Sequence, residues 1–334
     1  MRVLVTGGAG FIGSHLVDAL LARGDEVWAL DDLSTGSLKN LSGVITNPSC
    51  HFVEGSVMDA AVVDPLVAQV DEVFHLAAAV GVKFVLDNPL RSLLTNIRGT
   101  EVVLEAAHQN GNKKVVLFSS SEVYGKGASI PFRESDDRLL GPTSVLRWSY
   151  AASKAVDEFL ALGYFHERRL PVVVVRCFNT CGPRQSPHYG MVIPRFVERA
   201  LSNDPILVYG DGLQSRCFSS VHDVVRGVLM LAEEPKAYGE VFNIGTMEEV
   251  SVAELARRIK TLTNSRSEIE QVEYEAIYGS RFEDMQRRVP DLAKINALVG
   301  YTPEVTLDQL LHETVEHVKA QRTPAPQAAA AHAR

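Results

Sequence analysis

The sequence predicts an α/β protein in which a doubly wound parallel sheet carries a smaller C-terminal cap. Short β-rich runs alternate with amphipathic helical stretches through the first half of the chain, as in sheets whose parallel strands are joined by crossover helices. A glycine-rich loop follows the first run directly, and glycine and proline become closely spaced after Thr180, which indicates irregular backbone there. We therefore expect the sheet domain first and the cap after it.

The expected elements follow the hydrophobic periodicity of the chain. Six runs rich in β-branched residues are expected to be strands: residues 2–6, 26–30, 51–54, 72–76, 114–119 and 172–176. Helical periodicity covers residues 15–23, 65–70, 91–109 and 150–167, and the third of these ends at Asn110 and Gly111, a left-handed helix stop. Later segments are expected to be a return strand at 240–245 and helices at 252–262 and 307–318, the two helices lying mainly in the cap.

The glycine loop after the first strand predicts a dinucleotide site. Gly7, Gly10 and Gly13 open a helix, and glycine there permits the turn, a close approach of pyrophosphate to backbone N–H groups and tight packing of helix on strand. Asp31 ends the second strand 18 residues after Gly13, where a carboxylate accepts from the adenosine ribose and repels a 2′-phosphate. We therefore expect NAD as the cofactor. Further contacts are expected from Phe11, Ile12, Asp59, Leu76, Ala77 and Asn96.

These features predict two domains and a tail. Residues 1–180 are expected to form a Rossmann domain that binds NAD, with a return segment near 221–250. Residues 181–220 and 251–320 are expected to form a substrate-binding cap. The segment 322–334 is rich in proline and alanine, and we expect it to be disordered.

Composition narrows the class of partner and the compartment. Charged residues make up 22% of the chain, with a net charge of −8 and no basic patch, so nucleic acid is not expected as a partner. The longest apolar runs have strand length, and the amino terminus enters a strand without a signal-peptide pattern, so we expect a cytoplasmic protein without membrane contact. The four cysteines form no CxxC pair or metal-ligand spacing, and no metal is expected.

Tyr150 and Lys154 carry the candidate acid–base chemistry. They lie four residues apart in an expected helix and therefore share one face. A tyrosine hydroxyl is a poor base at neutral pH, but a neighbouring ammonium and the positive nicotinamide ring stabilise its phenolate. With the glycine loop and the strand-end residues Ser119, Ser120 and Ser121, residues 1 to about 320 resemble the extended short-chain dehydrogenase/reductase family.

This resemblance implies the roles of the site residues. Tyr150 would take the proton of a sugar hydroxyl while hydride passes to NAD, Ser120 would bind the same oxygen, and Lys154 would tune Tyr150 and contact the nicotinamide ribose. Asn179 in RCFNTCGPR and Arg216 in GDGLQSRCF resemble the family's diphosphate contacts. Tyr209 is a candidate for packing on the nucleotide base, with a core aromatic as the alternative.

The reaction within this family depends on Ser121, Glu122 and Arg288. Glucose-type 4,6-dehydratases usually carry Asp-Glu at this strand end and simple 4-epimerases usually lack the glutamate, whereas this chain reads Ser120-Ser121-Glu122, which is similar to the Thr-Ser-Glu of UDP-glucuronate decarboxylases. Ser121 and Arg288 are expected to contact substrate, with Arg288 on the carboxylate; a surface role for Arg288 is the alternative. GDP-mannose dehydratases also use Thr-Ser-Glu, so the glutamate alone does not decide.

We therefore expect NAD-dependent decarboxylation of UDP-glucuronate through a C4-keto intermediate, giving UDP-xylose and some released UDP-4-keto-pentose. Tyr150, Lys154, Ser120, Glu122 and Arg288 are the expected catalytic residues. The alternatives are a UDP-sugar or UDP-uronate 4-epimerase, then a nucleotide-sugar 4,6-dehydratase, and from another class a cofactor-holding scaffold protein, which the retained Tyr/Lys pair disfavours. Family resemblance also implies a homodimer formed by the helices at 91–109 and 150–167, although the apolar positions of these helices fit an intramolecular core equally well.

Overall fold

The computed structural model describes residues 1–127, 129–187, 191–278, 283 and 285–322. The expected tail lies almost wholly outside the described residues. Within the described part of the chain, no helix is long and apolar enough to cross a membrane.

A seven-stranded parallel sheet forms the centre of the molecule. Its order is β11-β6-β5-β4-β1-β2-β3, so the chain leaves β1 in both directions and the strand order reverses beside it. In open α/β sheets a ligand crevice lies at the carboxyl ends of the strands at this reversal. The strands are β1 (Arg2–Thr6), β2 (Glu26–Asp31), β3 (Cys50–Glu54), β4 (Glu72–His75), β5 (Lys114–Ser120), β6 (Val172–Cys177) and β11 (Glu240–Ile244).

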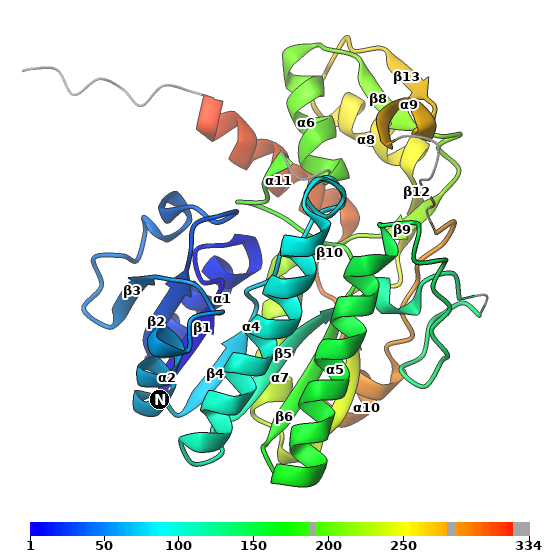
Figure 1. The fold of residues 1–334 in the computed structure, drawn as a ribbon. Coiled ribbons are helices and arrows are strands. Elements are labelled where there is room, and N and C mark those ends of the chain that lie inside the picture. The colour runs from blue at the N-terminus through cyan, green and yellow to red at the C-terminus, as the bar shows by residue number, and fades with distance from the viewer. Residues whose placement is uncertain (128, 188–190, 279–282, 284, 323–334) are drawn as a thin grey trace, which may run out of the picture.

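Helices cover both faces of this sheet, and each face has its own apolar core. One core packs helices α1, α7 and α10 against the sheet, and the other packs α2, α4 and α5. Figure 1 shows α4 and α5 side by side in front of the strands. The helices are α1 (Phe11–Ala22), α2 (Ala60–Gln69), α3 (Val82–Asp87), α4 (Pro89–Gln109), α5 (Trp148–Arg168), α7 (Val221–Ala232) and α10 (Ala293–Val299), with short turns η1 (Leu38–Leu41), η2 (Ser121–Tyr124) and η4 (Pro235–Ala237).

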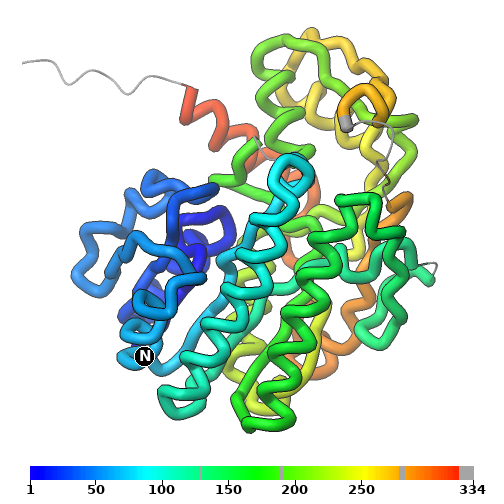
Figure 2. Tube along the Cα trace, in the orientation of Figure 1, coloured from blue at the N-terminus to red at the C-terminus, as the bar shows by residue number. Residues whose placement is uncertain are grey.

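The cap gathers segments that are far apart in the sequence, as the green, yellow, orange and red stretches at the top of Figure 2 show. A third apolar core holds it together around Phe196, Leu255 and Leu311. Its elements are α6 (Val192–Ser202), β8 (Ile206–Tyr209), α8 (Val252–Leu262), β13 (Ile269–Val272), α9 (Tyr274–Tyr278) and α11 (Leu307–Arg322). Two short strand pairs lie between the cap and the sheet domain: β7 (Thr180–Cys181) with β10 (Ser219–Ser220), and β9 (Ser215–Cys217) with β12 (Glu249–Ser251).

The fold class is confirmed, and the differences are local. The first two helices begin earlier than expected, at Phe11 and Ala60, because Gly10 and Asp59 occupy the N-cap positions before them. The segment 293–299, expected in the cap, instead packs against β11 and α7, because Ile295 inserts into the core on that face of the sheet.

Candidate active site

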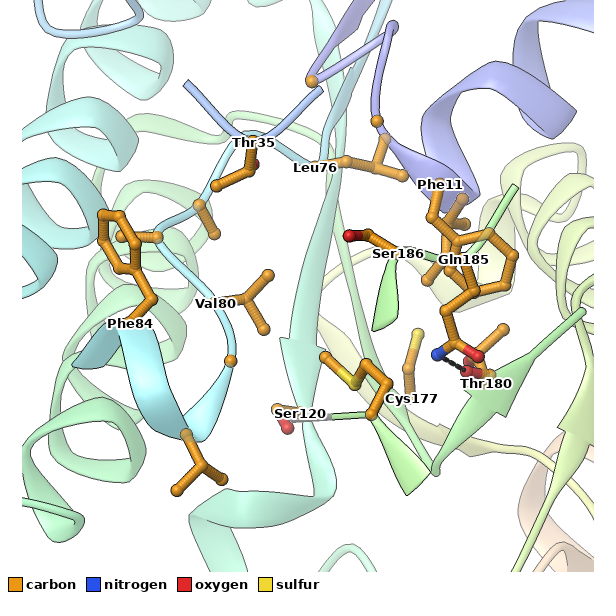
Figure 3. Close-up of a pocket in the computed structure, with 18 of the residues that line it drawn as sticks. Phe11, Thr35, Leu76, Val80, Phe84, Ser120, Cys177, Thr180, Gln185 and Ser186 are labelled. Carbon is orange, nitrogen blue, oxygen red and sulfur yellow. Dashed lines mark hydrogen bonds between the residues drawn. The ribbon is translucent and has the colours of Figure 1, made fainter. Parts of the chain in front are cut away.

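A single cavity of about 840 Å³ extends from the carboxyl ends of β1 and β2 to the cap. In Figure 3, Phe11 and Gln185 lie on one side of it, Val80 and Phe84 on the other, and Ser120 and Cys177 at one end between them. The cavity brings together most of the residues that the sequence singled out: Gly7, Gly10, Phe11, Ile12, Gly13, Asp31, Leu76, Ala77, Ser120, Ser121, Glu122, Tyr150, Lys154, Asn179, Tyr209, Arg216 and Arg288.

Asp59 and Asn96, two of the expected cofactor contacts, do not line this cavity, and each has partners within the fold. Asp59 is the N-cap of α2, where its carboxylate accepts from the backbone N–H of Ala61 at 3.0 Å, a common reason for an aspartate just before a helix. Asn96 is buried in α4, accepts from the N–H of Ala79 at 2.8 Å and donates to Ser153 Oγ at 2.9 Å. Asn96 therefore fixes the loop after β4 against α5.

The glycine loop is shaped for a ligand that comes close to the backbone. Gly7 has a φ of +71°, and a Cβ on Gly13 would lie 2.0 Å from the carbonyl oxygen of Gly7, so larger residues are excluded by conformation at one position and by contact at the other. The loop leads into the N-terminus of α1, whose first turn carries no acidic residue. Backbone N–H groups at a helix N-terminus attract phosphate.

Asp31 lies at the end of β2 beside this loop. Its two carboxylate oxygens accept from the backbone N–H groups of Ala9 at 3.0 Å and Leu33 at 2.8 Å, which fixes the carboxylate at the cavity wall. Burial raises the pKa of Asp31 above its usual value, although the backbone hydrogen bonds oppose this. Each oxygen keeps acceptor capacity for a ribose hydroxyl. The residues present thus fit a dinucleotide whose 2′ position is a free hydroxyl.

Ser120 and Tyr150 meet because β5 ends where α5 begins to cross it. The Ser120 hydroxyl oxygen accepts from the backbone N–H of Glu122 at 3.2 Å, which leaves its proton to be donated, and its partner is the Tyr150 hydroxyl. Burial, followed by the negative charge of Glu122, raises the pKa of Tyr150 above its usual value. The expected stabilisation of the phenolate by Lys154 is not what dominates here, because Lys154 pairs with the buried Asp157 at 3.1 Å.

Glu122 forms the centre of a buried charge cluster. Arg147 Nη1 donates to one of its oxygens at 2.5 Å, and Arg288 Nη2 lies 2.7 Å from the other. Burial disfavours ionisation of this carboxyl, but the two guanidinium groups outweigh it and hold the pKa of Glu122 well below its usual range. Arg288 also lies 3.4 Å from Ser121 Oγ and from Asn179 Oδ1. Two cations for one anion give this part of the cavity a net positive charge.

The cap side of the cavity provides polar and aromatic groups. Arg216 is anchored through the backbone oxygens of Ser215 at 2.8 Å and Gln286 at 3.2 Å, while its positive charge reaches Glu122. The guanidinium of Arg195 lies 3.8 Å from the centroid of the Tyr209 ring, and Tyr209 is a partly buried residue of the cavity wall.

Sequence reasoning missed Arg147, Arg195 and Asp157. Arg147 precedes Tyr150 by three residues and so shares its side of the helix start, which was an available signal. Arg195 and Asp157 gave none, because charged residues in helices are usually solvated. The sequence favours an exposed loop position for His188 over a substrate contact, and this residue lies outside the described residues. Within the described part of the chain, no group of three His, Cys, Asp or Glu side chains is placed to hold a metal ion.

Comparison with known proteins places the chain among enzymes of nucleotide sugars. It is 44% identical over 316 residues to a UDP-N-acetyl-alpha-D-glucosaminuronate decarboxylase of Bacillus cytotoxicus, covering 94% of this chain and 97% of the relative. It is 36% identical to UDP-glucuronic acid decarboxylase 4 of Arabidopsis thaliana, covering 92% of this chain and 66% of that one. Identity to UDP-glucuronic acid decarboxylase 1 of Xenopus tropicalis is 34%, covering 95% and 72%.

Solved structures agree with this placement. A dTDP-glucose 4,6-dehydratase from Streptomyces venezuelae with NAD and TYD bound has a TM-score of 0.87 at 35% identity, covering 96% of this chain and 98% of that one. A UDP-glucuronic acid 4-epimerase from Bacillus cereus, in complex with UDP-glucuronic acid and NAD, has a TM-score of 0.87 at 27% identity, covering 96% and 100%. The family model described as GDP-mannose 4,6 dehydratase matches residues 4–314, and the chain belongs to this family of extended short-chain dehydrogenases/reductases.

Proposed function

We propose that this protein is an NAD-dependent decarboxylase of a UDP-linked uronic acid, with UDP-glucuronate as the substrate tested first. The observation that carries the proposal is the buried cluster of Arg147, Glu122 and Arg288 beside Ser120 and Tyr150. A net positive, largely desolvated site next to the proton acceptor suits a substrate that brings its own carboxylate. The names of the relatives support this reading, since decarboxylases are among those at 34–44% identity.

Each residue of the site has its own role in the proposed decarboxylation. Bound NAD supplies the hydride acceptor at C4 and later the hydride donor. Tyr150 accepts the proton of the C4 hydroxyl, and Ser120 donates a hydrogen bond to O4, where negative charge develops when the C5–C6 bond breaks and its electron pair enters the enolate. Arg147 and Arg288 orient the carboxylate that leaves as carbon dioxide. C5 then takes up one proton from solvent, and Tyr150 gives the proton it accepted back to O4 as hydride returns to C4, which yields UDP-xylose.

A UDP-N-acetylglucosaminuronate is the second candidate substrate, favoured by the relative at 44% identity. The experiment is incubation of the purified enzyme with each uronate and with UDP-glucose. Carbon dioxide release from a uronate supports the proposal, and the ratio of kcat/KM values selects between hydroxyl and acetamido groups at C2. UDP-galacturonate formed without carbon dioxide would establish the 4-epimerase, and conversion of UDP-glucose to a 4-keto-6-deoxy sugar would establish the dehydratase.

We expect Asp31 to select NAD over NADP. Its carboxylate is fixed at the cavity wall and would lie against a 2′-phosphate, so NADP should bind at least about tenfold more weakly, equivalent to about 1.4 kcal/mol. Calorimetry of both cofactors measures this ratio. Asp31→Asn keeps the shape of the side chain and removes its charge, so the NAD and NADP affinities of this variant should lie closer together. NADP binding as tight as NAD in the parent enzyme would refute the assignment.

We expect the enzyme to release some UDP-4-keto-pentose together with UDP-xylose. Serine at position 120 lacks the methyl group that restricts the side-chain torsion of threonine, so O4 is held less rigidly while hydride returns. A change of about 1.4 kcal/mol between return and release alters the product ratio tenfold. Ser120→Thr should therefore lower the keto share. NMR and mass spectrometry quantify both products, and NADH absorbance at 340 nm must rise in proportion to the ketone; a parent enzyme that forms only UDP-xylose contradicts the idea.

We also propose that α4 and α5 form a homodimer interface in a cytoplasmic enzyme. These adjacent helices expose Leu90, Leu94, Val156 and Phe159, more apolar surface than two solvated helices need. Light scattering should give about twice the 36.5 kDa of one chain, and Phe159→Glu should reduce this measured mass.

The proposed cytoplasmic location has separate support. The four cysteines are free thiols, which is typical of a reducing compartment.

A further inference from the structure

Lys154 has a buried counter-ion that the proposed chemistry does not use. Its Nζ lies 3.1 Å from Asp157 Oδ2, one helical turn further along α5, and the two side chains are 3% and 0% exposed. A carboxylate this deeply buried is costly unless it is paired. The pairing also has an electrostatic effect, because an ammonium matched by a carboxylate acts on a third group with much less than its full charge.

A chain of hydrogen bonds from Thr6 through His75 orients the Thr100 hydroxyl toward Asp157. Thr6 Oγ1 accepts from the N–H groups of Leu76 and Ala77, both at 3.2 Å, so its own proton is donated to His75 Nδ1 at 2.8 Å. Burial lowers the pKa of His75 to about 3, and this ring is therefore neutral at physiological pH.

In this tautomer His75 Nε2 carries the proton and donates it to Thr100 Oγ1 at 3.1 Å. The Thr100 hydroxyl proton is then free to face Asp157, where hydrogen bonding from Thr100 lowers the carboxyl pKa. Burial nevertheless raises the pKa of Asp157 overall, with Lys154 as the strongest opposing influence. The pair with Lys154 is thus what holds this carboxylate charged.

We propose that Asp157 is a positioning residue for Tyr150 and Lys154: its carboxylate fixes the ammonium and offsets its charge at Tyr150, so that the proton acceptor ionises only at higher pH. This inference rests on the proposed role of Tyr150 as the proton acceptor. It accounts for the raised pKa of Tyr150 in a site that also contains Lys154.

The other groups around Tyr150 and Lys154 do not take over this role. Glu122 faces Tyr150 from η2 and raises its pKa, but its own charge is matched by two arginines. Cys177 faces both residues from β6, and burial raises the pKa of its thiol to about 12, which keeps it neutral. His75 faces Lys154 from β4 and is neutral as well. Asp157 is therefore the negative group that acts on Tyr150 both directly and through Lys154.

The test is Asp157→Asn, which keeps the size of the side chain and an acceptor for Lys154 while removing the charge. Tyr150 accepts a proton only when ionised, so a lower pKa moves the acidic limb of the kcat/KM profile to lower pH. We expect a shift of about one pH unit. The same shift should appear in the tyrosinate absorbance titration of the NAD-bound enzyme without sugar, after subtraction of the Tyr150→Phe spectrum.

Glu158→Gln is the matched control. Glu158 is the next residue of α5 and equally buried, but it pairs with Arg176 at 2.8 Å and Arg138 at 3.3 Å, so its loss should leave the Tyr150 titration unchanged. An unchanged titration in Asp157→Asn would make Asp157 merely structural, and a shift to higher pH would mean that Lys154 loses its charge without it; either result overturns the proposal. If thermal melting shows Asp157→Asn to be unfolded, Asp157→Ser repeats the test. Because the absorbance titration uses no sugar, its result stands even if UDP-glucuronate is not the substrate.

Discussion

Tyr150→Phe is expected to lower kcat by about 10³-fold while NAD and UDP bind with unchanged affinity. General-base groups contribute about 10²–10⁴-fold, and this substitution removes only the phenolic oxygen that accepts the C4 proton. The ring remains against the cavity wall and Ser120 keeps its hydrogen bond from the Glu122 backbone. The loss should therefore fall on the chemical step and not on the fold.

Single-turnover measurements provide the direct reading of this variant. NADH absorbance after mixing the NAD-bound enzyme with UDP-glucuronate reports oxidation at C4, and it should be absent or about 10³-fold slower than in the parent. Calorimetric affinities for NAD and UDP serve as the control for intact binding. Turnover within about tenfold of the parent would show that another group accepts the proton, and Ser120 would then be the first to test.

Arg288→Ala is expected to lower kcat/KM for UDP-glucuronate by about 150-fold while UDP affinity changes little. Removing one member of a buried charge pair typically costs about 3–5 kcal/mol. We expect a cost at the lower end of this range, because Arg147 still pairs with Glu122 at 2.5 Å in the variant. The diphosphate keeps Arg216, so the defect should be specific to the substrate that carries a carboxylate.

Arg287→Ala is the matched control for this prediction. Arg287 is the neighbouring residue, but its guanidinium is exposed and pairs with Glu249 at 2.7 Å, away from the Glu122 cluster. We expect its kcat/KM to stay within about twofold of the parent, as for most surface substitutions. Arg288→Lys separates charge from shape, because lysine keeps the charge and loses the two-pronged geometry. Unchanged processing of UDP-glucuronate by Arg288→Ala would remove Arg288 from the carboxylate site.

The sequence alone determined the features that depend on local spacing. Glycines at fixed offsets after a strand, with Asp31 at the end of the next one, are sufficient for the cofactor end of the cavity, because loop and helix start are continuous in the chain. Tyr150 and Lys154 could be paired for the same reason, since a four-residue spacing in a helix puts two side chains on one face. The alternation of strands and helices likewise predicts the sheet.

Tertiary structure decided what depends on burial and on contacts between distant segments. From the sequence, Asp59 fits a ribose ligand and a helix cap equally well. Only the structure shows that it caps α2 and lies outside the cavity lining. Glu122 is 25 residues from Arg147 and lies on a different element from Arg288, so their pairing could not be read from spacing. Asp157 looks like one more helix surface charge until its 0% exposure and its contact with Lys154 are known. The charge state of an active-site group is set by every neighbour within a few ångströms, and the fold alone brings those neighbours together.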